Sequence, residues 1–538
     1  MDVTPDTPDT ATLHDDVEKK GLSELERTDE ALLKREGDHG IKRDLPPRVV
    51  SMIAIAGTIG TGLFLSSGSA LTSGGPVGAF LGYTVMGIMV GCMMYCLGEM
   101  MCFKPNVGAY IEMGATYVDP AVAFCMSWAC MMQSCVCIPA EISAIGLLAG
   151  YWDKNTDHLA GYIAAGVVAV ALITVIPVRW YGEVEFFFAA VKVTALIGLI
   201  IFGIVVNTGG VPGSSYIGGR YWVHEPFNDT FLDLKPVSKA RFLGFWQVMT
   251  AAGYSFSGME SLAVVAGEAA NPRHTMRVAV RTVFYRVVGL YCLSILILGL
   301  SVSQHSPDLL DAVNAGGETA ASSPFVVLCR QVNVKVLPDI INAVVLTSAF
   351  SSANENAYAV ARFTMAMARQ GWLPKSIFLY TYNGVPIAGA LFASAMGCLA
   401  FMSCSEGSNQ VFVWFSNLDA LSAMVLWILI CATYTRFHRA LKVQGIDRRN
   451  LSFRSWGQPY LAYMCIVFFS LVVLFNGFSS FVNGFKVSNF IASYITLPIL
   501  FTAWAGFKIV RRSKVVPLES IDLSGGPAKA LIGTAYDK

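Results

Sequence analysis

Residues 57–62 read Gly-Thr-Ile-Gly-Thr-Gly and lie in the middle of an apolar run from about 49 to 72. The run has the roughly 20 apolar residues that a helix needs to cross a lipid bilayer. Three glycines in six residues form a poor helix, because each costs about 1 kcal/mol relative to alanine. Inside a membrane an interrupted helix is tolerated only beside a protein-lined cavity. The stretch therefore predicts an unwound segment within a span, with close packing of small residues as the alternative.

A second interruption occurs at residues 253–260, which read Gly-Tyr-Ser-Phe-Ser-Gly-Met-Glu in the run 243–267. Two interrupted spans at equivalent places in two halves of a chain indicate a transporter site near the bilayer midplane. Freed N–H groups suit a carboxylate, and freed carbonyl groups suit an ammonium. The pair of interruptions thus predicts a site for a zwitterion such as an amino acid. The substrate-binding residues expected on this basis are Gly57, Thr58, Ile59, Gly60, Thr61, Gly62, Tyr254, Ser255, Phe256, Ser257 and Gly258. We add Glu141, which follows Pro139 in the third span near the level expected for the pocket.

The composition is that of a polytopic membrane protein. Of the 538 residues 54% are apolar and 14% are charged, against roughly 25% charged in soluble domains. The net charge of +1 gives no electrostatic basis for binding nucleic acid. We expect an all-α chain embedded in a lipid bilayer through 12 transmembrane helices. The predicted spans are 49–72, 77–101, 120–150, 160–178, 185–206, 243–267, 281–303, 337–366, 386–403, 410–434, 460–481 and 489–510.

Charges in the connections predict the orientation. Lysine and arginine concentrate in alternate connections and after the last span, whereas the short connections between them carry few. By the positive-inside rule both termini face the cytosol. We therefore divide the chain into a disordered cytosolic tail (1–48), a transporter domain (49–511) and a cytosolic C-terminal tail (512–538). Within the domain, the first repeat covers about 49–206, the second about 243–434, and two extra helices about 460–510.

Several motifs resemble the fungal, yeast-type amino-acid permeases of the amino acid–polyamine–organocation superfamily. They occur in order at 56–64, 74–76, 97–100, 117–120, 181–186, 255–260, 268–273 and 342–346. The resemblance implies a LeuT-like fold of 5+5 inverted repeats plus two extra helices. It also implies proton-coupled import of L-amino acids by alternating access at the plasma membrane, and ubiquitin ligase adaptors acting on the cytosolic tails. An exchanger or a non-transporting amino-acid sensor on the same fold is the alternative.

Charged residues within spans need a reason, because each costs about 2.5–3.5 kcal/mol at a helix centre. The resemblance implies that Lys192 in the fifth span replaces a bound sodium ion and couples transport to protons. A structural lysine that reaches toward the cytosolic interface is the alternative. Glu260 closes the second interruption and, by resemblance, supports the unwound backbone or relays a proton. Glu141 either contacts substrate or a proton, or makes a plain buried hydrogen bond.

Other polar and aromatic residues leave two interpretations each. Glu355 and Asp419 depart from the family pattern, and they either line the cavity and favour cationic substrates or pair with Arg362 or another base. Phe256 and Tyr254 are candidate lids over the substrate, with core packing as the alternative. Glu185 is expected, like Glu99, at a cytosolic span end, paired with a nearby base.

The sequence contains no pattern that predicts an enzyme. No histidine and cysteine cluster has metal-ligand spacing, and no phosphate loop or Ser/His/Asp signature stands out. We therefore expect no catalytic residue, no metal site and no cofactor. The 13 cysteines lie mostly in apolar runs, which favours buried packing.

Overall fold

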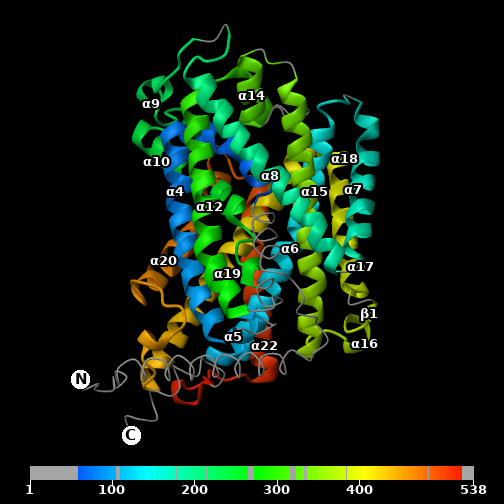
Figure 1. The fold of residues 1–538 in the computed structure, drawn as a ribbon, viewed down its shortest axis with the longest axis vertical. Coiled ribbons are helices and arrows are strands. Elements are labelled where there is room, and N and C mark those ends of the chain that lie inside the picture. The colour runs from blue at the N-terminus through cyan, green and yellow to red at the C-terminus, as the bar shows by residue number, and fades with distance from the viewer. Residues whose placement is uncertain are drawn as a thin grey trace, which may run out of the picture.

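The computed structural model describes residues 59–523, apart from 105–108, 154, 177, 213–214, 264–271, 315–322, 333, 335, 383–384 and 483. The predicted tail 1–48, the start of the first span, and residues 524–538 lie outside the described residues. The described chain is mostly helical, and its long helices run roughly side by side (Figure 1).

The longer helices match most of the predicted apolar runs. Their bounds are α4 (Ser66–Phe103), α6 (Pro120–Ala149), α7 (Leu159–Thr174), α8 (Val178–Asn207), α10 (Val237–Phe256), α12 (Pro272–Ser301), α15 (Leu337–Arg369), α17 (Ile387–Gly397), α19 (Ser408–Val443), α20 (Tyr460–Phe475) and α22 (Thr496–Arg511).

Short elements connect the longer ones. The short α-helices are α3 (Thr61–Phe64), α5 (Ala109–Tyr117), α9 (Arg220–His224), α13 (Pro307–Asn314), α14 (Pro324–Gln331), α16 (Lys375–Phe378), α18 (Ser403–Glu406) and α21 (Val487–Tyr494). The 3₁₀ turns are η1 (Thr156–His158), η2 (Phe231–Asp233), η4 (Cys398–Met402), η5 (Arg448–Asn450), η6 (Phe478–Phe481) and η7 (Leu518–Ser520). Two short strands among the described residues depart from the all-α expectation: β1 (Thr381–Tyr382) and β2 (Val385–Pro386) pair antiparallel, with Thr381 opposite Pro386.

Among the described residues, six helices are long and apolar enough to cross a membrane, or seven if the bent pair α21–α22 is one span. The predicted count of twelve is not reached by length and composition alone. Helix α7 has only 16 residues, α10 stops at the predicted interruption, and α15 includes buried polar and charged residues. The passing segments are Ser66–Phe103, Pro120–Ala149, Trp180–Asn207, Ile387–Ser405, Ser408–Val443 and Tyr460–Phe481.

Helix α4 contains the turn between the first two predicted spans. Gly75 has φ 74° and ψ 174°, outside the helical region, and Pro76 follows it. A straight helix would place Gly62 and Tyr83 about 30 Å apart. Both lie against Ser255 instead: the Tyr83 hydroxyl is 2.8 Å from Ser255 Oγ, and a Cβ on Gly62 would be 2.7 Å from Ser255 Cα. The chain therefore reverses direction at Gly75.

The helices pack as two groups. Helix α4 packs against α10 and α12, whereas α6 packs against α7, α15 and α17. Helix α19 contacts both groups, through α6 on one side and through α4 and α10 on the other. A single core of buried apolar side chains runs through the described chain. The site described below lies between these groups.

Polar contacts join the helix ends at one end of the bundle. Glu99, at the end of α4, accepts two hydrogen bonds of 2.9 Å from the Arg448 guanidinium. The segment after α22 also packs there: Val516 N–H donates to the Val118 carbonyl, and Lys104 pairs with Asp522 at 2.9 Å. The expected pairing of Glu99 with a base is confirmed, and the loops from three parts of the sequence meet at this end.

Candidate functional site

Helix α10 stops at the predicted second interruption. It ends at Phe256, and residues 257–260 form turns before the chain becomes helical again at Ser261. Gly258 has φ 88°, a left-handed conformation that glycine adopts without steric cost. The structure thus confirms an interruption and places it at residues 257–260, since residues 253–256 still belong to α10.

The first interruption is described from Ile59 onward, and Gly57 and Thr58 lie outside the described residues. Gly60 is extended (φ −107°, ψ −161°) and precedes the short helix α3. A Cβ on Gly60 would lie 2.9 Å from Glu141 Oε1 and 3.1 Å from Ser352 Oγ. The missing side chain therefore lets Glu141 and Ser352 approach the backbone. The Ile59 carbonyl accepts a hydrogen bond of 2.9 Å from Ser348, so part of the freed backbone is already satisfied.

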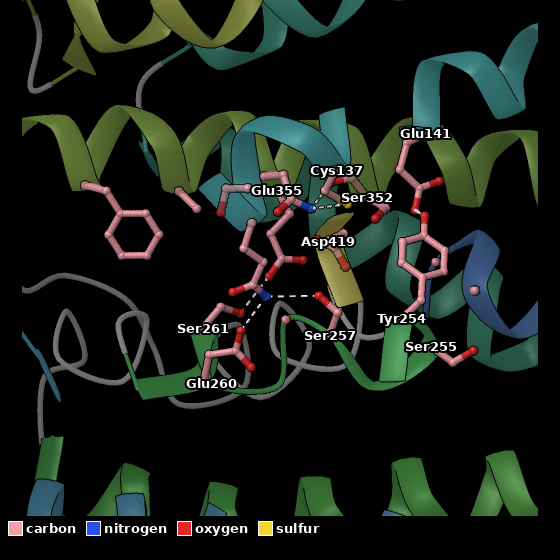
Figure 2. Close-up of a pocket in the computed structure, with 18 of the residues that line it drawn as sticks. Cys137, Glu141, Tyr254, Ser255, Ser257, Glu260, Ser261, Ser352, Glu355 and Asp419 are labelled. Carbon is pink, nitrogen blue, oxygen red and sulfur yellow. Dashed lines mark hydrogen bonds between the residues drawn. The ribbon is translucent and has the colours of Figure 1, made fainter. Parts of the chain in front are cut away.

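The two interruptions border one pocket (Figure 2). Its volume is about 40 Å³, room for only a few water molecules, so the pocket is narrow in this conformation. Polar side chains from α6, α10, α15 and α19 surround it. The lining residues are Gly60, Gly62, Tyr110, Gln133, Ser134, Cys137, Glu141, Tyr254, Ser255, Ser257, Gly258, Glu260, Ser261, Ser352, Glu355, Asn356, Ala359, Phe363 and Asp419.

Tyr254 links the first interruption to α6. Its hydroxyl lies 3.1 Å from Thr61 Oγ1 and donates to Glu141 Oε1 at 3.2 Å. Its ring packs edge-on against Phe412. Tyr254 also borders a second cavity of about 170 Å³, which Ser66 and other residues line. One side chain therefore stands between the two cavities, as a lid would.

Phe256, the other predicted lid, has different surroundings. It is fully buried and its ring packs against those of Tyr83 and Tyr291, with centroids 6.2 and 5.0 Å away. It is absent from the pocket lining. The structure therefore brings Tyr254 to the pocket and places Phe256 behind it in the core.

Glu260 anchors the second interruption to two other helices. Gln133 of α6 donates to its Oε1 at 2.5 Å, and the Trp427 indole of α19 donates to its Oε2 at 2.9 Å. Gln133 also donates to Ser257 Oγ at 2.9 Å. These bonds hold the residues 257–260 against α6 and α19.

Lys192 of α8 is not among the residues that line the pocket, and it is 1% exposed. It is within electrostatic range of Glu185, Glu355 and Glu141. Glu185 is fully buried and accepts a hydrogen bond of 2.5 Å from Ser351. The expectation that Glu185 lies at a span end is therefore wrong. Residues 181–186 continue α8 into the bundle, so Glu185 sits two helical turns from Lys192.

Glu355 and Asp419 both line the pocket. Glu355 Oε1 accepts a hydrogen bond of 3.0 Å from Ser261. The Arg362 guanidinium, the base considered for pairing, lies 3.7 Å over the Tyr358 ring. The cavity-lining interpretation of the two acids fits their positions.

Sequence reasoning missed the small polar residues on α6 and α15. Gln133, Ser134 and Cys137 share a face of α6 with Glu141, at spacings of three or four residues. Ser352 and Asn356 follow the same helical spacing on α15. Polar residues at this spacing mark both faces, but the spacing does not show whether such a face borders a cavity or another helix. Among the described residues, no three His, Cys, Asp or Glu side chains are placed to hold a metal ion.

These features define a multi-pass membrane protein with a buried polar pocket beside two non-helical backbone segments, at residues 59–60 and 257–260, the arrangement of a small-molecule carrier. The family model "Amino acid permease" matches residues 49–518. The chain therefore belongs to the amino acid permease family.

Permeases named for different amino acids are similar to it. An uncharacterized amino-acid permease of Schizosaccharomyces pombe is 36% identical over 90% of this chain and 92% of its own length. The lysine-specific permease of Saccharomyces cerevisiae is 35% identical over 90% and 79%. A probable proline-specific permease of Schizosaccharomyces pombe is 37% identical over 88% and 86%. The relatives support amino-acid transport without selecting one amino acid.

Proposed function

We propose that this protein is a secondary active transporter that imports L-amino acids with protons across the plasma membrane by alternating access. The observation that carries the proposal is the single narrow pocket that Gly60 and Gly62 line on one side and Ser255, Ser257 and Gly258 on the other. Non-helical backbone beside a protein-lined cavity offers N–H and C=O groups to a zwitterion.

Alternating access requires the pocket to change its size. The cavity of about 40 Å³ is too small for most amino acids, so it must widen before a substrate can bind. Tyr254 stands between this pocket and the second cavity, so rotation of its side chain would connect them. We propose Tyr254 as the lid on that side, with Phe256 supporting it from the core.

We further propose 12 spans arranged as two inverted repeats of five plus two extra helices. In that arrangement the first, second, third and fourth spans correspond to the sixth, seventh, eighth and ninth. The packing supports this proposal, because α3 and α4 contact α10, α4 contacts α12, α6 contacts α15, and α7 contacts α17. The group α4, α10 and α12 would rock against the group α6, α7, α15 and α17.

Proton coupling is assigned to Lys192 and Glu260. Lys192 is buried among carboxylates, so adding or removing a proton there changes the charge balance near the pocket. Glu260 ties the second interruption to α6 and α19, so its state is linked to the backbone that would bind substrate.

The end of the bundle that carries Lys104, Arg436, Arg448 and Lys508 is proposed to face the cytosol. Both termini would then be cytosolic. Ubiquitin ligase adaptors acting on the tails remain a proposal that rests on the resemblance.

The test is uptake of a panel of radiolabelled amino acids by transport-deficient yeast cells that express the full chain. We expect accumulation against a gradient, faster at external pH 5 than at pH 7. An exchanger would accumulate label only in cells preloaded with amino acid, and a sensor would bind without accumulation. Either result would contradict proton-coupled import.

Replacement of Lys192 by methionine tests the coupling. The Lys192→Met variant should lose accumulation against a gradient, because the carboxylates around Lys192 would no longer be balanced. The exposed Lys239→Met variant is the matched control. Undiminished pH-driven accumulation in Lys192→Met would remove Lys192 from the coupling mechanism.

A further inference from the structure

Among the charged side chains that line the pocket bordered by the two interruptions, acids are in excess. Four of its lining residues are acids, and the lining that the structure describes includes no lysine, arginine or histidine. All four are at most 7% exposed. The acids are Glu141, Glu260, Glu355 and Asp419.

Three of the four acids have partners in the protein. Glu141 accepts from the Tyr254 hydroxyl, and Glu260 accepts from Gln133 and Trp427. Glu355 accepts from Ser261 and lies within electrostatic range of Lys192. Their charges and lone pairs are thus at least partly satisfied without a ligand.

Asp419 differs from the other three. It is fully buried, and neither of its carboxylate oxygens makes a hydrogen bond of ordinary geometry with a described residue. The Ser257 hydroxyl approaches it, but the charged groups that act on it are the acids Glu260 and Glu141. A buried carboxylate without a basic partner is strongly unfavourable unless a cation or a proton joins it.

Resting on the proposed transport of amino acids, we infer that the preferred substrates are basic amino acids, whose side-chain cation binds Asp419. A zwitterion alone has no net charge and leaves Asp419 uncompensated, whereas lysine or arginine brings one additional positive charge. Figure 2 shows Asp419 in the middle of the pocket, between Glu355 and Tyr254. An amino acid held at the first interruption, beside Tyr254, would direct its side chain toward Asp419.

Arginine and citrulline form the substrate pair that tests this inference. They have nearly the same shape, but citrulline has a neutral ureido group in place of the guanidinium. A charge-assisted hydrogen bond to a buried carboxylate corresponds to roughly a tenfold preference or more. In yeast cells expressing the full chain, the ratio of Vmax to KM for arginine should exceed that for citrulline by at least about tenfold. Equal values in the unmodified protein would overturn the inference.

Substitutions then test the residue. Asp419→Asn removes the charge at nearly constant volume, and the arginine preference should fall toward one. Asp419→Glu keeps the charge and should retain the preference. Ser422→Ala on the same helix is the control, because Ser422 is buried and its hydroxyl donates to the Leu418 carbonyl of its own helix. An Asp419→Asn variant that reaches the surface and keeps the full arginine preference would overturn the assignment.

The role of Asp419 in selecting cations is separable from transport itself. Thermal stabilisation of the purified protein by arginine and by citrulline reports binding without transport. Stronger stabilisation by arginine in a protein that accumulates nothing would contradict the transport proposal and leave the charge preference intact. Accumulation of neutral amino acids with no preference for arginine would contradict the charge preference and leave the transport proposal intact. Equal loss of arginine and citrulline uptake in Asp419→Asn, at normal surface abundance, would instead assign Asp419 to the coupled proton and overturn the inference.

Discussion

At the scale of single residues, Tyr254 and Phe256 show that two aromatic side chains two residues apart on one helix can have very different surroundings. The Tyr254 hydroxyl contacts Thr61 and Glu141 and borders the pocket. Phe256 is enclosed by Tyr83 and Tyr291. Residue type and position made both of them candidate lids, and only their surroundings separate them.

Substitutions at the two positions should therefore have different consequences. Tyr254→Phe removes two hydrogen bonds at the pocket and should raise the substrate KM about two- to tenfold, at unchanged surface abundance. Phe256→Leu leaves unfilled space in the core and should lower the free energy of unfolding by about 1–3 kcal/mol, with a smaller change in KM. Uptake kinetics, together with the melting temperature of purified protein, measure both effects. A large KM change in Phe256→Leu without loss of stability would return the lid role to Phe256.

The sequence indicates some of the pocket residues and not others, for a physical reason. Gly60, Gly62 and Gly258 interrupt apolar runs, and a broken pattern is visible in one dimension. Ser352 and Asn356 belong to an uninterrupted helix, where small polar residues suit either a cavity or helix packing equally well. Which face of α15 points inward depends on its neighbours, and hydropathy does not contain that information.

At the scale of elements, the interruption of α10 depends on a glycine. Because Gly258 has φ 88°, an alanine there would be strained by about 1–3 kcal/mol. Gly258→Ala should therefore lower the melting temperature and reduce uptake. Gly289→Ala in α12 is the matched control, since nothing lies within 4 Å of the added Cβ, and alanine favours a helix by up to about 1 kcal/mol. Equal behaviour of the two variants would show that the conformation of residues 257–260 is not required.

The sequence predicts a helix boundary well where neighbouring residues determine it, and poorly where contacts with distant parts of the chain determine it. The apolar run 120–150 matches α6 (Pro120–Ala149) closely, because Asp119 and Pro120 mark the start of the helix locally. The run 410–434 underestimates α19, which continues to Val443. The additional turns are polar and are held by loops from elsewhere in the chain, including the Arg436 bond to the Tyr117 carbonyl.

At the scale of the whole molecule, equivalent helices of the two proposed repeats pack against one another. The sequence suggested two halves because each contains a glycine-rich interruption. It contained no signal that α6 would contact α15 or that α7 would contact α17. Those contacts join residues roughly 200 positions apart, so they depend on the closure of the whole bundle.

Two arginine–carboxylate pairs allow the polar contacts at the end of the bundle that carries Glu99 to be tested. Arg448 binds Glu99 with two hydrogen bonds of 2.9 Å, and the Glu99 side chain is 0% exposed. Arg241 binds Asp229 with a similar two-bond geometry, but both side chains are about half exposed. The two pairs share their chemistry and differ chiefly in burial.

Burial should decide the effect of removing the charge. Glu99→Gln leaves Arg448 without its counterion and also weakens the bonds from Ser455 to Glu99, so stability should fall by on the order of 3 kcal/mol. Asp229→Asn should cost less than about 1 kcal/mol, because solvent screens an exposed pair. Melting temperatures of the two purified variants, compared with the unmodified protein, measure the difference. Because Glu99 joins α4 to the segment after α19, an equally small effect of both substitutions would mean that this contact does not stabilise this end of the bundle.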